Sequence, residues 1–205
     1  MAEIVKIISF DMDQNCYLVY DNESKEGFLI DPGADTFKIL KTIEEKNVNV
    51  TAILLTHCHY DHVFSVNELR RGRKLVASNE CSENIRNTKR SLSFVTGDEF
   101  VIEEPEIIMS DGEERCISGI NVKMIKTPGH TECSVCYLID GVLFSGDTLF
   151  LRNVGRWDLP TGNEELLRKS IKEKLYTLPD ETVVMCGHGS DTTIGYEKKF
   201  NFFIN

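Results

Sequence analysis

The sequence lacks any long apolar run and any excess of positive charge. No hydrophobic stretch among its 205 residues approaches the roughly 20 residues that a membrane-spanning helix needs. Its 33 acidic residues outnumber its 23 lysines and arginines, which gives a formal net charge of -10. A protein that reads a nucleic-acid backbone would show a basic face instead. We therefore expect partners that include neither membranes nor nucleic acids.

The marks of a secreted protein are also missing. Residues 1–10 are too short and too interrupted by charge for a signal peptide. The seven cysteines are an odd number scattered along the chain, unlike a disulfide framework. Cys133 and Cys136 have CxxC spacing, but residues three apart on a strand face opposite ways, which argues against a redox or zinc motif. We expect a cytoplasmic protein.

Length and hydrophobic patterning predict one α/β domain over residues 1–205. A chain of this length can bury a substantial core. Short apolar runs bounded by turn residues indicate strands, and segments with one apolar face indicate helices. Helices packed outside sheets would bury both kinds of apolar surface. Strands are predicted at 4–10, 16–20, 28–30, 51–55, 74–77, 99–102, 107–109, 115–117, 121–126, 134–140, 142–145 and 182–186, and helices at 35–46, 66–71, 80–86, 163–176 and 194–203.

Three of these helices have predicted core contacts. Asn163 is a good cap for the helix over 163–176, and Glu164 and Glu165 suit its first turn. The side chains expected to face the core are Phe37, Leu40 and Ile43 in the first helix, Leu167, Ile171 and Leu175 in the helix over 163–176, and Phe200 and Phe203 in the last.

All five histidines stand where a metal site would need them. Three fall within the six residues His57-Cys58-His59-Tyr60-Asp61-His62, just after the predicted buried strand at 51–55. Sites in α/β proteins form in loops beyond the carboxyl ends of strands. Imidazole is the commonest protein metal ligand, and histidines with an aspartate suit zinc, iron or manganese. This cluster predicts a metal site, with the intervening Cys58 side chain facing the core.

The remaining candidate ligands are flanked by glycines. His130 follows Gly129, and His188 lies between Gly187 and Gly189. Glycine allows tight turns and close backbone approach at each position. Two neighbouring ions need a shared acidic ligand, and Asp147, just past an apolar strand, is the candidate. Such ions would lie about 3.5–4 Å apart.

The same residues resemble those of a known family. The segments 56–62 (THCHYDH), 128–131 (PGHT), 146–150 (GDTLF) and 187–189 (GHG) resemble the metallo-β-lactamase fold superfamily. Within it the chain is similar to the single-domain bacterial glyoxalase II-like enzymes, also called hydroxyacylglutathione hydrolases, with further similarity at 15–19, 29–33, 155–160 and 192–197. The resemblance implies a four-layer αβ/βα sandwich.

The resemblance also implies a ligand set. It assigns His57, His59 and His130 to one metal, Asp61, His62 and His188 to a second, and Asp147 to both as a bridge. Two divalent ions follow, zinc first, with iron or manganese also compatible. The chain departs from the family at Val63-Phe64-Ser65, where a Gly-Gly pair usually follows one apolar residue. We expect Phe64 to change the pocket wall beside the metals.

The implied activity is metal-dependent hydrolysis of a thioester, such as S-lactoylglutathione or a related acyl-thiol, by a metal-bridging hydroxide. Once the histidines bind metal, none remains to activate a serine or cysteine nucleophile. Glyoxalase II proper adds a helical C-terminal domain that helps hold glutathione, and we expect this shorter chain to lack it. The thiol half of the small-molecule substrate stays open, as does the oligomeric state.

The substrate contacts are expected in the loop after the bridging aspartate. Arg152, Arg156 and Trp157 could touch an acidic substrate there. Arg156 could instead form a structural ion pair with Asp158.

Two other classes stay open. One is a persulfide dioxygenase-like oxidoreductase with a single iron, which shares the Gly-Arg-x-Asp segment but is disfavoured by Gly187-His188-Gly189. The other is a non-catalytic metal-binding protein. Metal counting separates the first of these from a hydrolase.

Overall fold

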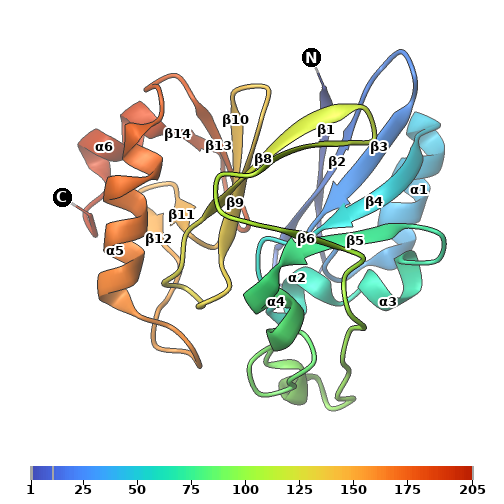
Figure 1. The fold of residues 1–205 in the computed structure, drawn as a ribbon, viewed down its shortest axis with the longest axis horizontal. Coiled ribbons are helices and arrows are strands. Elements are labelled where there is room, and N and C mark those ends of the chain that lie inside the picture. Colours follow the sequence, from blue (N-terminus) through green and yellow to red (C-terminus); the bar gives the residue numbers. More distant parts are fainter. Residues whose placement is uncertain (1, 11, 205) are drawn as a thin grey trace.

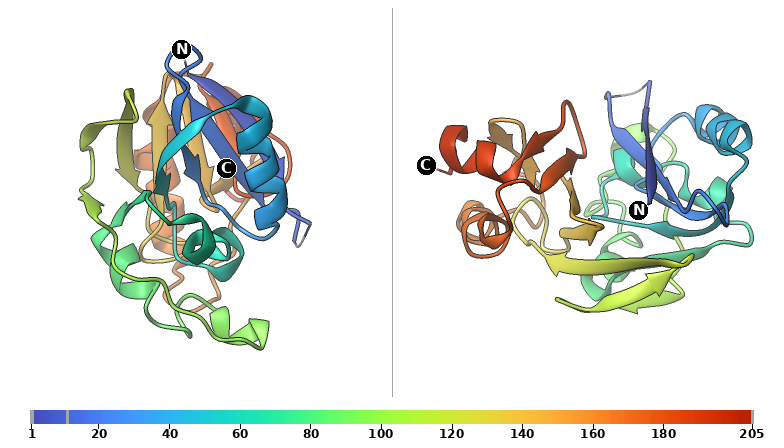
Figure 2. Two further views of the ribbon diagram at one scale, coloured as in Figure 1. Left: turned by 90° about the vertical axis from the view of Figure 1, so that its right-hand side faces the viewer. Right: turned by 90° about the horizontal axis from the view of Figure 1, so that it is seen from above.

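Two six-stranded sheets lie face to face, and helices cover their outer sides (Figure 1). The computed structural model describes residues 2–10 and 12–204. Helix α1 and helices α5 and α6 lie on opposite sides of the paired sheets, as the view from above shows (Figure 2). This arrangement is the αβ/βα sandwich that the resemblance implies.

The first sheet has the order β1-β2-β3-β4-β5-β6. Strands β1 to β3 pair antiparallel with one another, and strands β3 to β6 pair parallel. The strands are β1 (Glu3–Ile8), β2 (Asn15–Tyr20), β3 (Glu26–Ile30), β4 (Asn49–Leu54), β5 (Lys74–Ser78) and β6 (Ile107–Met109). The helices of this half are α1 (Thr36–Lys46), α2 (Tyr60–Val63), α3 (Val66–Leu69) and α4 (Asn79–Asn84), with a 3-10 turn at Ser93–Thr96.

The second sheet has the order β14-β13-β10-β9-β8-β7. Its strands are antiparallel except for the parallel pair β10 and β13. They are β7 (Glu114–Ile117), β8 (Ile120–Lys126), β9 (Val135–Ile139), β10 (Val142–Gly146), β13 (Val183–Cys186) and β14 (Thr192–Thr193). A small hairpin, β11 (Leu149–Phe150) with β12 (Asn153–Val154), precedes α5 (Glu164–Glu173), a 3-10 turn (Leu175–Thr177) and α6 (Ile194–Phe200).

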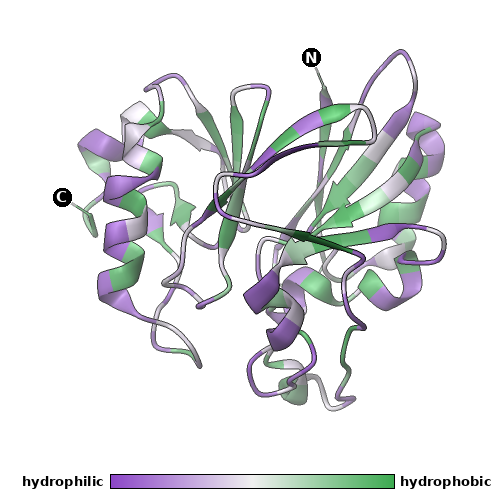
Figure 3. Cartoon of the chain, viewed as in Figure 1, coloured by the Kyte–Doolittle hydropathy of each residue, from purple (hydrophilic) through white to green (hydrophobic). Residues whose placement is uncertain are grey.

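The apolar side chains form three buried layers. The strands are largely hydrophobic, whereas α1, α5 and α6 carry both colours in Figure 3. Between the sheets, Tyr17 packs edge-on against Phe144 with ring centroids 5.1 Å apart. One outer layer joins α1 to the first sheet, and the other joins α5 and α6 to the second. Hydrophobic burial on both faces of each sheet therefore fixes the strands whose ends carry the candidate ligands.

Two buried tyrosines anchor the backbone next to these ligands. The Tyr137 hydroxyl donates to the Leu55 carbonyl at 2.9 Å, and the Tyr17 hydroxyl donates to the Cys186 carbonyl at 2.6 Å. Leu55 lies two residues before His57, and Cys186 two before His188. A buried hydroxyl needs a partner, so these bonds also satisfy the tyrosines in the inter-sheet core.

Several predicted contacts of the helices need correction. The buried face of α1 is Ile39 and Ile43, while Phe37 is 79% exposed and Leu40 is 41% exposed. The two core-facing residues are therefore four positions apart, and of the three predicted core residues only Ile43 is one of them. Helix α6 ends at Phe200.

The C-terminal aromatic residues do not form the predicted core. Phe200 and Phe203 are 45% and 38% exposed, and the buried positions are instead Ile194, Glu197 and Ile204. By contrast, Leu167, Ile171 and Leu175 are buried as predicted. Asn163 caps α5 by accepting a hydrogen bond from the Leu166 amide at 2.9 Å.

The strand predicted at 99–102 is wrong. This segment has no neighbouring strand. Its hydrogen bonds go elsewhere: the Ile102 amide donates to Ile85, the Asn67 side chain donates to Val101, and Arg70 donates to Glu103. Ile102 is buried, so the segment has the apolar pattern of a strand. It lacks the backbone hydrogen bonds to a neighbouring strand that a strand requires.

The expectation for the CxxC pair is met. The thiols of Cys133 and Cys136 are both buried, and they belong to different layers, which excludes a shared CxxC site. None of the helices in the described residues combines the length and hydrophobicity that crossing a bilayer requires.

Gly129 is predicted to be intolerant of any side chain. It has φ +148°, and a Cβ there would lie 2.3 Å from backbone atoms of Leu167 in α5. Gly129→Ala should lower the free energy of unfolding by about 3 kcal/mol, since clash and strain combine. Gly119→Ala is the control, because Gly119 has φ +78° but nothing within 4 Å of an added Cβ. It should cost about 1–2 kcal/mol. Urea unfolding measures both, and equal losses would contradict the clash.

Candidate metal centre

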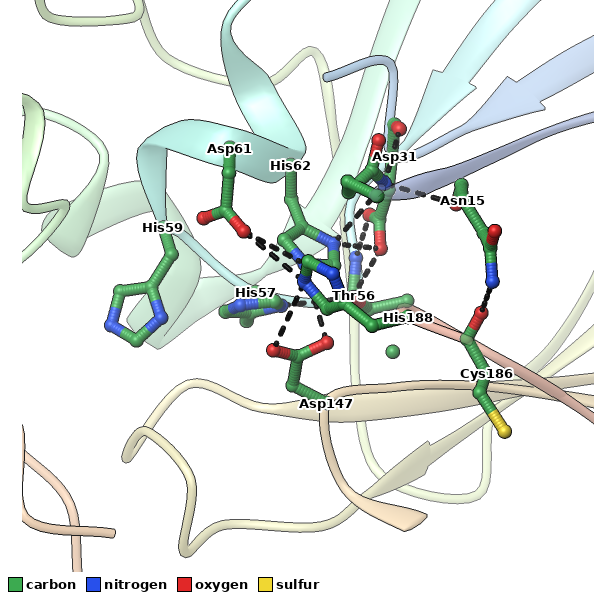
Figure 4. A network of polar contacts seen from close by, with 12 residues as sticks. Asn15, Asp31, Thr56, His57, His59, Asp61, His62, Asp147, Cys186 and His188 are labelled. Atoms are coloured by element: carbon green, nitrogen blue, oxygen red, sulfur yellow. Dashed lines mark hydrogen bonds and ion pairs between the residues drawn. The ribbon is translucent and has the colours of Figure 1, made fainter. Parts of the chain in front are cut away.

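The candidate ligands come from four segments that converge at one site, and Figure 4 labels all of these ligands except His130. His57 and His59 follow β4, Asp61 and His62 lie in α2, and His130 lies between β8 and β9. Asp147 follows β10, and His188 follows β13. The parallel pairing of β10 with β13 places Gly146 opposite Cys186, so these two loops leave the sheet side by side. The fold therefore gathers ligands from distant parts of the sequence.

The first group is His57, His59 and His130. One possible ligand atom from each lies within 4.8 Å of the others. His130 Nε2 lies 2.9 Å from His59 Nδ1. All three imidazoles are buried, with no residue more than 3% exposed. Converging ring nitrogens without an intervening polar group are typical of a metal site.

The second group is Asp61, His62 and His188. Their possible ligand atoms also lie within 4.8 Å of one another. His188 Nε2 is 3.2 Å from Asp61 Oδ2 and 3.3 Å from His62 Nε2. Two imidazoles and one carboxylate suit zinc, iron or manganese, the same divalent cations that suit the first group.

The Asp147 carboxylate lies between the two groups. Its Oδ1 is 3.2 Å from His62 Nε2, and its Oδ2 is 3.6 Å from both His130 Nε2 and His188 Nε2. Figure 4 shows this carboxylate facing the rings of His62 and His188. One side chain thus reaches both groups, as the bridging position requires.

Two ring nitrogens at this site have no hydrogen-bond partner among the described residues. They are His57 Nε2 and His59 Nε2, and both are buried. A buried polar atom without a partner costs about 1–3 kcal/mol. Imidazole nitrogens and carboxylate oxygens are the donors that zinc, iron and manganese accept. The residues therefore fit a divalent metal centre.

The opposite nitrogens of four histidines are held by neighbours. His62 Nδ1 lies 2.9 Å from Asp31 Oδ2, and His57 Nδ1 lies 3.0 Å from Thr56 Oγ1. Backbone carbonyls hold the other two: Arg156 O is 2.7 Å from His130 Nδ1, and Met12 O is 3.0 Å from His188 Nδ1. A proton on each Nδ1 leaves Nε2 unprotonated and able to bind a metal ion. Outer partners orient metal-binding histidines in this way.

Asp31 is the functional residue that the sequence analysis missed. It is 2% exposed and has φ 49°. Its Oδ1 accepts from the Thr56 amide at 2.7 Å, and its Oδ2 accepts from the Thr56 hydroxyl at 2.5 Å as well as from His62. Asp31 therefore orients His62 directly and His57 through Thr56. Its Asp-Pro-Gly context after a strand looks like an ordinary turn, so only spatial proximity reveals the role.

Burial and charge set the protonation of the histidines. Burial lowers the pKa of His57 well below its usual value and lowers that of His59 to about 4. Both imidazoles are therefore neutral near pH 7, as metal binding requires. Burial also opposes a charge on His62, but the carboxylates of Asp147 and Asp61 outweigh it and raise the His62 pKa. Negative charge in the site thus attracts a cation.

A glycine allows the loops to approach this closely. A Cβ on Gly187 would lie 2.2 Å from Asp147 Oδ1 and 2.7 Å from His62 Cε1. Any side chain here would displace the carboxylate between the two groups.

A cavity of about 340 Å³ opens beside the candidate ligands. Of the three predicted substrate contacts, Arg156 lines it, but Arg152 and Trp157 do not. Arg152 Nε donates to the Tyr196 hydroxyl at 2.6 Å, and its guanidinium lies over the rings of Tyr196 and Phe200. Trp157 packs against Phe203 with ring centroids 6.0 Å apart. Aromatic contacts thus draw both side chains away from the site.

The predicted effect of Phe64 on the pocket wall also needs correction. Phe64 is 49% exposed and packs edge-on against Phe100, with ring centroids 5.5 Å apart. It does not line the cavity. The departure from the family motif therefore lies outside the site.

Asp31→Asn should weaken metal binding by about 10- to 100-fold, because an outer partner of two histidines is altered. The neutral amide keeps one acceptor for Thr56 but no longer holds His62 with a charge. Competition titration against a chelator measures the affinity. Asp21→Asn, just before the exposed turn at 22–24, serves as the control and should bind metal like the parent. Unchanged affinity in Asp31→Asn would show that Asp31 is only a turn residue.

Asp61→Asn should lower the metal content from two ions per chain to one. The substitution removes the anionic member of the second group and leaves His57, His59 and His130 intact. Elemental analysis of reconstituted, dialysed protein gives the count. Asp98→Asn, at an exposed loop position, should retain the parental content. A parental content of one ion would contradict the two-group interpretation.

The comparisons with known proteins agree on the family. The family model "Metallo-beta-lactamase superfamily" matches residues 10–188. The hydroxyacylglutathione hydrolase GloC of Haemophilus influenzae is 35% identical over 211 residues, covering 99% of this chain and 97% of that protein.

Two solved structures support the same assignment. The BLEG-1 B3 metallo-β-lactamase has a TM-score of 0.93 at 31% identity and covers 99% of this chain and 100% of its own. The protein TTHA1623 in a di-iron-bound form has a TM-score of 0.83 at 31% identity, with 97% and 99% coverage. With ligand loops, fold and family model in agreement, the chain belongs to the metallo-β-lactamase superfamily.

Proposed function

We propose that this chain is a dinuclear metal-dependent hydrolase that cleaves thioesters. The observation that carries the proposal is the Asp147 carboxylate, which faces two complete ligand groups beside an open cavity. Bound divalent cations would lower the pKa of a coordinated water and stabilise negative charge on a carbonyl oxygen. A thioester suits such a site because thiolate is a good leaving group.

The metal ligands would divide as the resemblance implies. His57, His59 and His130 would hold one ion, and Asp61, His62 and His188 the other. We propose zinc as the metal, and iron also fits, since the related TTHA1623 is known in a di-iron-bound form.

The chain's own residues position this chemistry without forming a covalent intermediate. All five histidines belong to the two groups, so none is left to activate a nucleophile. Of the cysteines, six are buried, and the exposed Cys116 lies on β7 away from the cavity. In the overall reaction the water oxygen bonds to the acyl carbon, the carbon–sulfur bond breaks, and the thiol leaves with a proton.

A relative's name supports a thioester as the class of substrate. GloC carries the name hydroxyacylglutathione hydrolase, and it matches this chain along nearly its whole length. The one-iron oxidoreductase remains the alternative. It would use a subset of these ligands, and the assembled second group therefore favours the hydrolase.

Thioester hydrolysis should depend on metal and on Asp147. Thiol release from S-D-lactoylglutathione and from a neutral short-chain thioester is followed with a chromogenic disulfide. Chelation should abolish turnover and added zinc should restore it, whereas Asp147→Asn should lower kcat at least 100-fold with loss of metal. Cys58→Ala and Cys116→Ala should retain the chemical step. Turnover that survives complete chelation, or an acylated cysteine found by mass spectrometry, would refute the mechanism.

A further inference from the structure

The cavity beside the candidate ligands has an apolar wall. Besides residues of the two ligand groups and Asp147, its lining consists of five uncharged side chains and one arginine. Phe150 stands edge-on to His188, with ring centroids 6.2 Å apart. The uncharged side chains are Met12, Tyr60, Leu92, Phe150 and Leu159. A substrate group beside the candidate ligands can therefore pack against apolar side chains along part of the cavity wall.

Two of these wall residues are held in an unfavourable backbone conformation. Met12 has φ 57° and Leu92 has φ 61°, a left-handed region that bulky side chains rarely adopt. Such strain persists only where the surroundings impose it, and it clusters at ligand-binding sites. The Tyr60 amide donates to the Ser91 carbonyl at 2.8 Å, and the Tyr60 hydroxyl contacts Met12 Sδ at 2.9 Å. Tyr60 thus links both strained residues to the loop that carries the ligands.

The cavity offers little to a carboxylate. Arg156 is the one lysine or arginine among its lining residues in the described part of the chain. Asp158 already engages that guanidinium through both oxygens, at 2.7 and 2.8 Å. The pair is solvent-exposed, but Asp158 is only two residues away, so a substrate carboxylate must compete with an intramolecular partner.

Glutathione carries two carboxylates near neutral pH, and in this wall its thioesters would find one cationic side chain, which Asp158 already engages. We infer that the substrate is an acyl thioester whose thiol half is uncharged and partly apolar, held by Leu92, Met12 and Phe150. This inference rests on the proposed function, because it identifies the leaving group of that same hydrolysis. Leu92 is the residue that discriminates between thiol halves by packing against the neutral one.

Two thioesters that share the same acyl group but differ in the thiol half test the inference. Metal-replete parent enzyme is assayed with S-D-lactoylglutathione and with S-D-lactoyl-N-acetylcysteamine, whose thiol half is neutral. The neutral thioester should have at least a tenfold higher kcat/KM, mainly through a lower KM. A higher kcat/KM for the glutathione thioester overturns the inference and leaves the proposed hydrolase standing. If the enzyme hydrolyses neither compound, the proposed function itself is overturned.

Leu92→Gly separates packing from folding. Glycine adopts φ 61° readily, so this variant should be at least as stable as the parent while it loses the apolar side chain. It should raise KM for the neutral thioester about tenfold and change KM for the glutathione thioester little. Asn47→Gly is the matched control, because Asn47 has φ 51° and caps α1 far along the chain from the cavity lining. An unchanged KM for the neutral thioester in Leu92→Gly refutes the role of Leu92.

Asp158→Asn tests the electrostatic half of the inference. Removing the carboxylate frees the Arg156 guanidinium to face the cavity. KM for the glutathione thioester should then fall at least threefold relative to KM for the neutral one. If the ratio of the two KM values does not change, the Arg156–Asp158 pair is not what excludes an anionic thiol half.

Discussion

The site depends on the burial of a carboxylate among imidazoles. Asp147 is surrounded by ring nitrogens of His62, His130 and His188, and charge on His62 holds the pKa of this carboxyl far below its usual range although burial opposes ionisation. A buried anion is stable only when cationic or hydrogen-bonding partners surround it. The five imidazoles of the site cannot all be protonated, since burial keeps His57 and His59 neutral. A divalent cation satisfies the anion and the unprotonated rings at once.

The rest of the structure keeps these groups from relaxing apart. The parallel β10–β13 pair fixes the separation of Asp147 and His188, and buried tyrosines fix the strand ends that precede His57 and His188. Asp31 then restrains the rotation of His62. Preorganisation of this kind matters because a ligand set that is free to rotate loses conformational entropy on binding.

The sequence predicted which residues meet at the site better than it predicted the packing. His57, His59, Asp61, His62, His130, Asp147 and His188 could be found because they follow strand ends in a recognisable pattern, and the structure brings them together. The buried face of α1 could not be found, because Phe37, Ile39, Leu40 and Ile43 allow more than one apolar stripe. The segment 99–102 is apolar like a strand, but side chains of Asn67 and Arg70 take its hydrogen bonds. Asp31 and Arg152 depend on partners far along the chain, which local pattern does not reveal.

Each ligand group draws on both halves of the chain. His57 and His59 come from the first half and His130 from the second, and Asp61 and His62 meet His188 in the same way. Neither group can therefore exist in a nascent chain until the second sheet has docked on the first. Ion capture becomes a late event that fastens one half to the other, and the stability of their union rises with the free metal concentration around the protein.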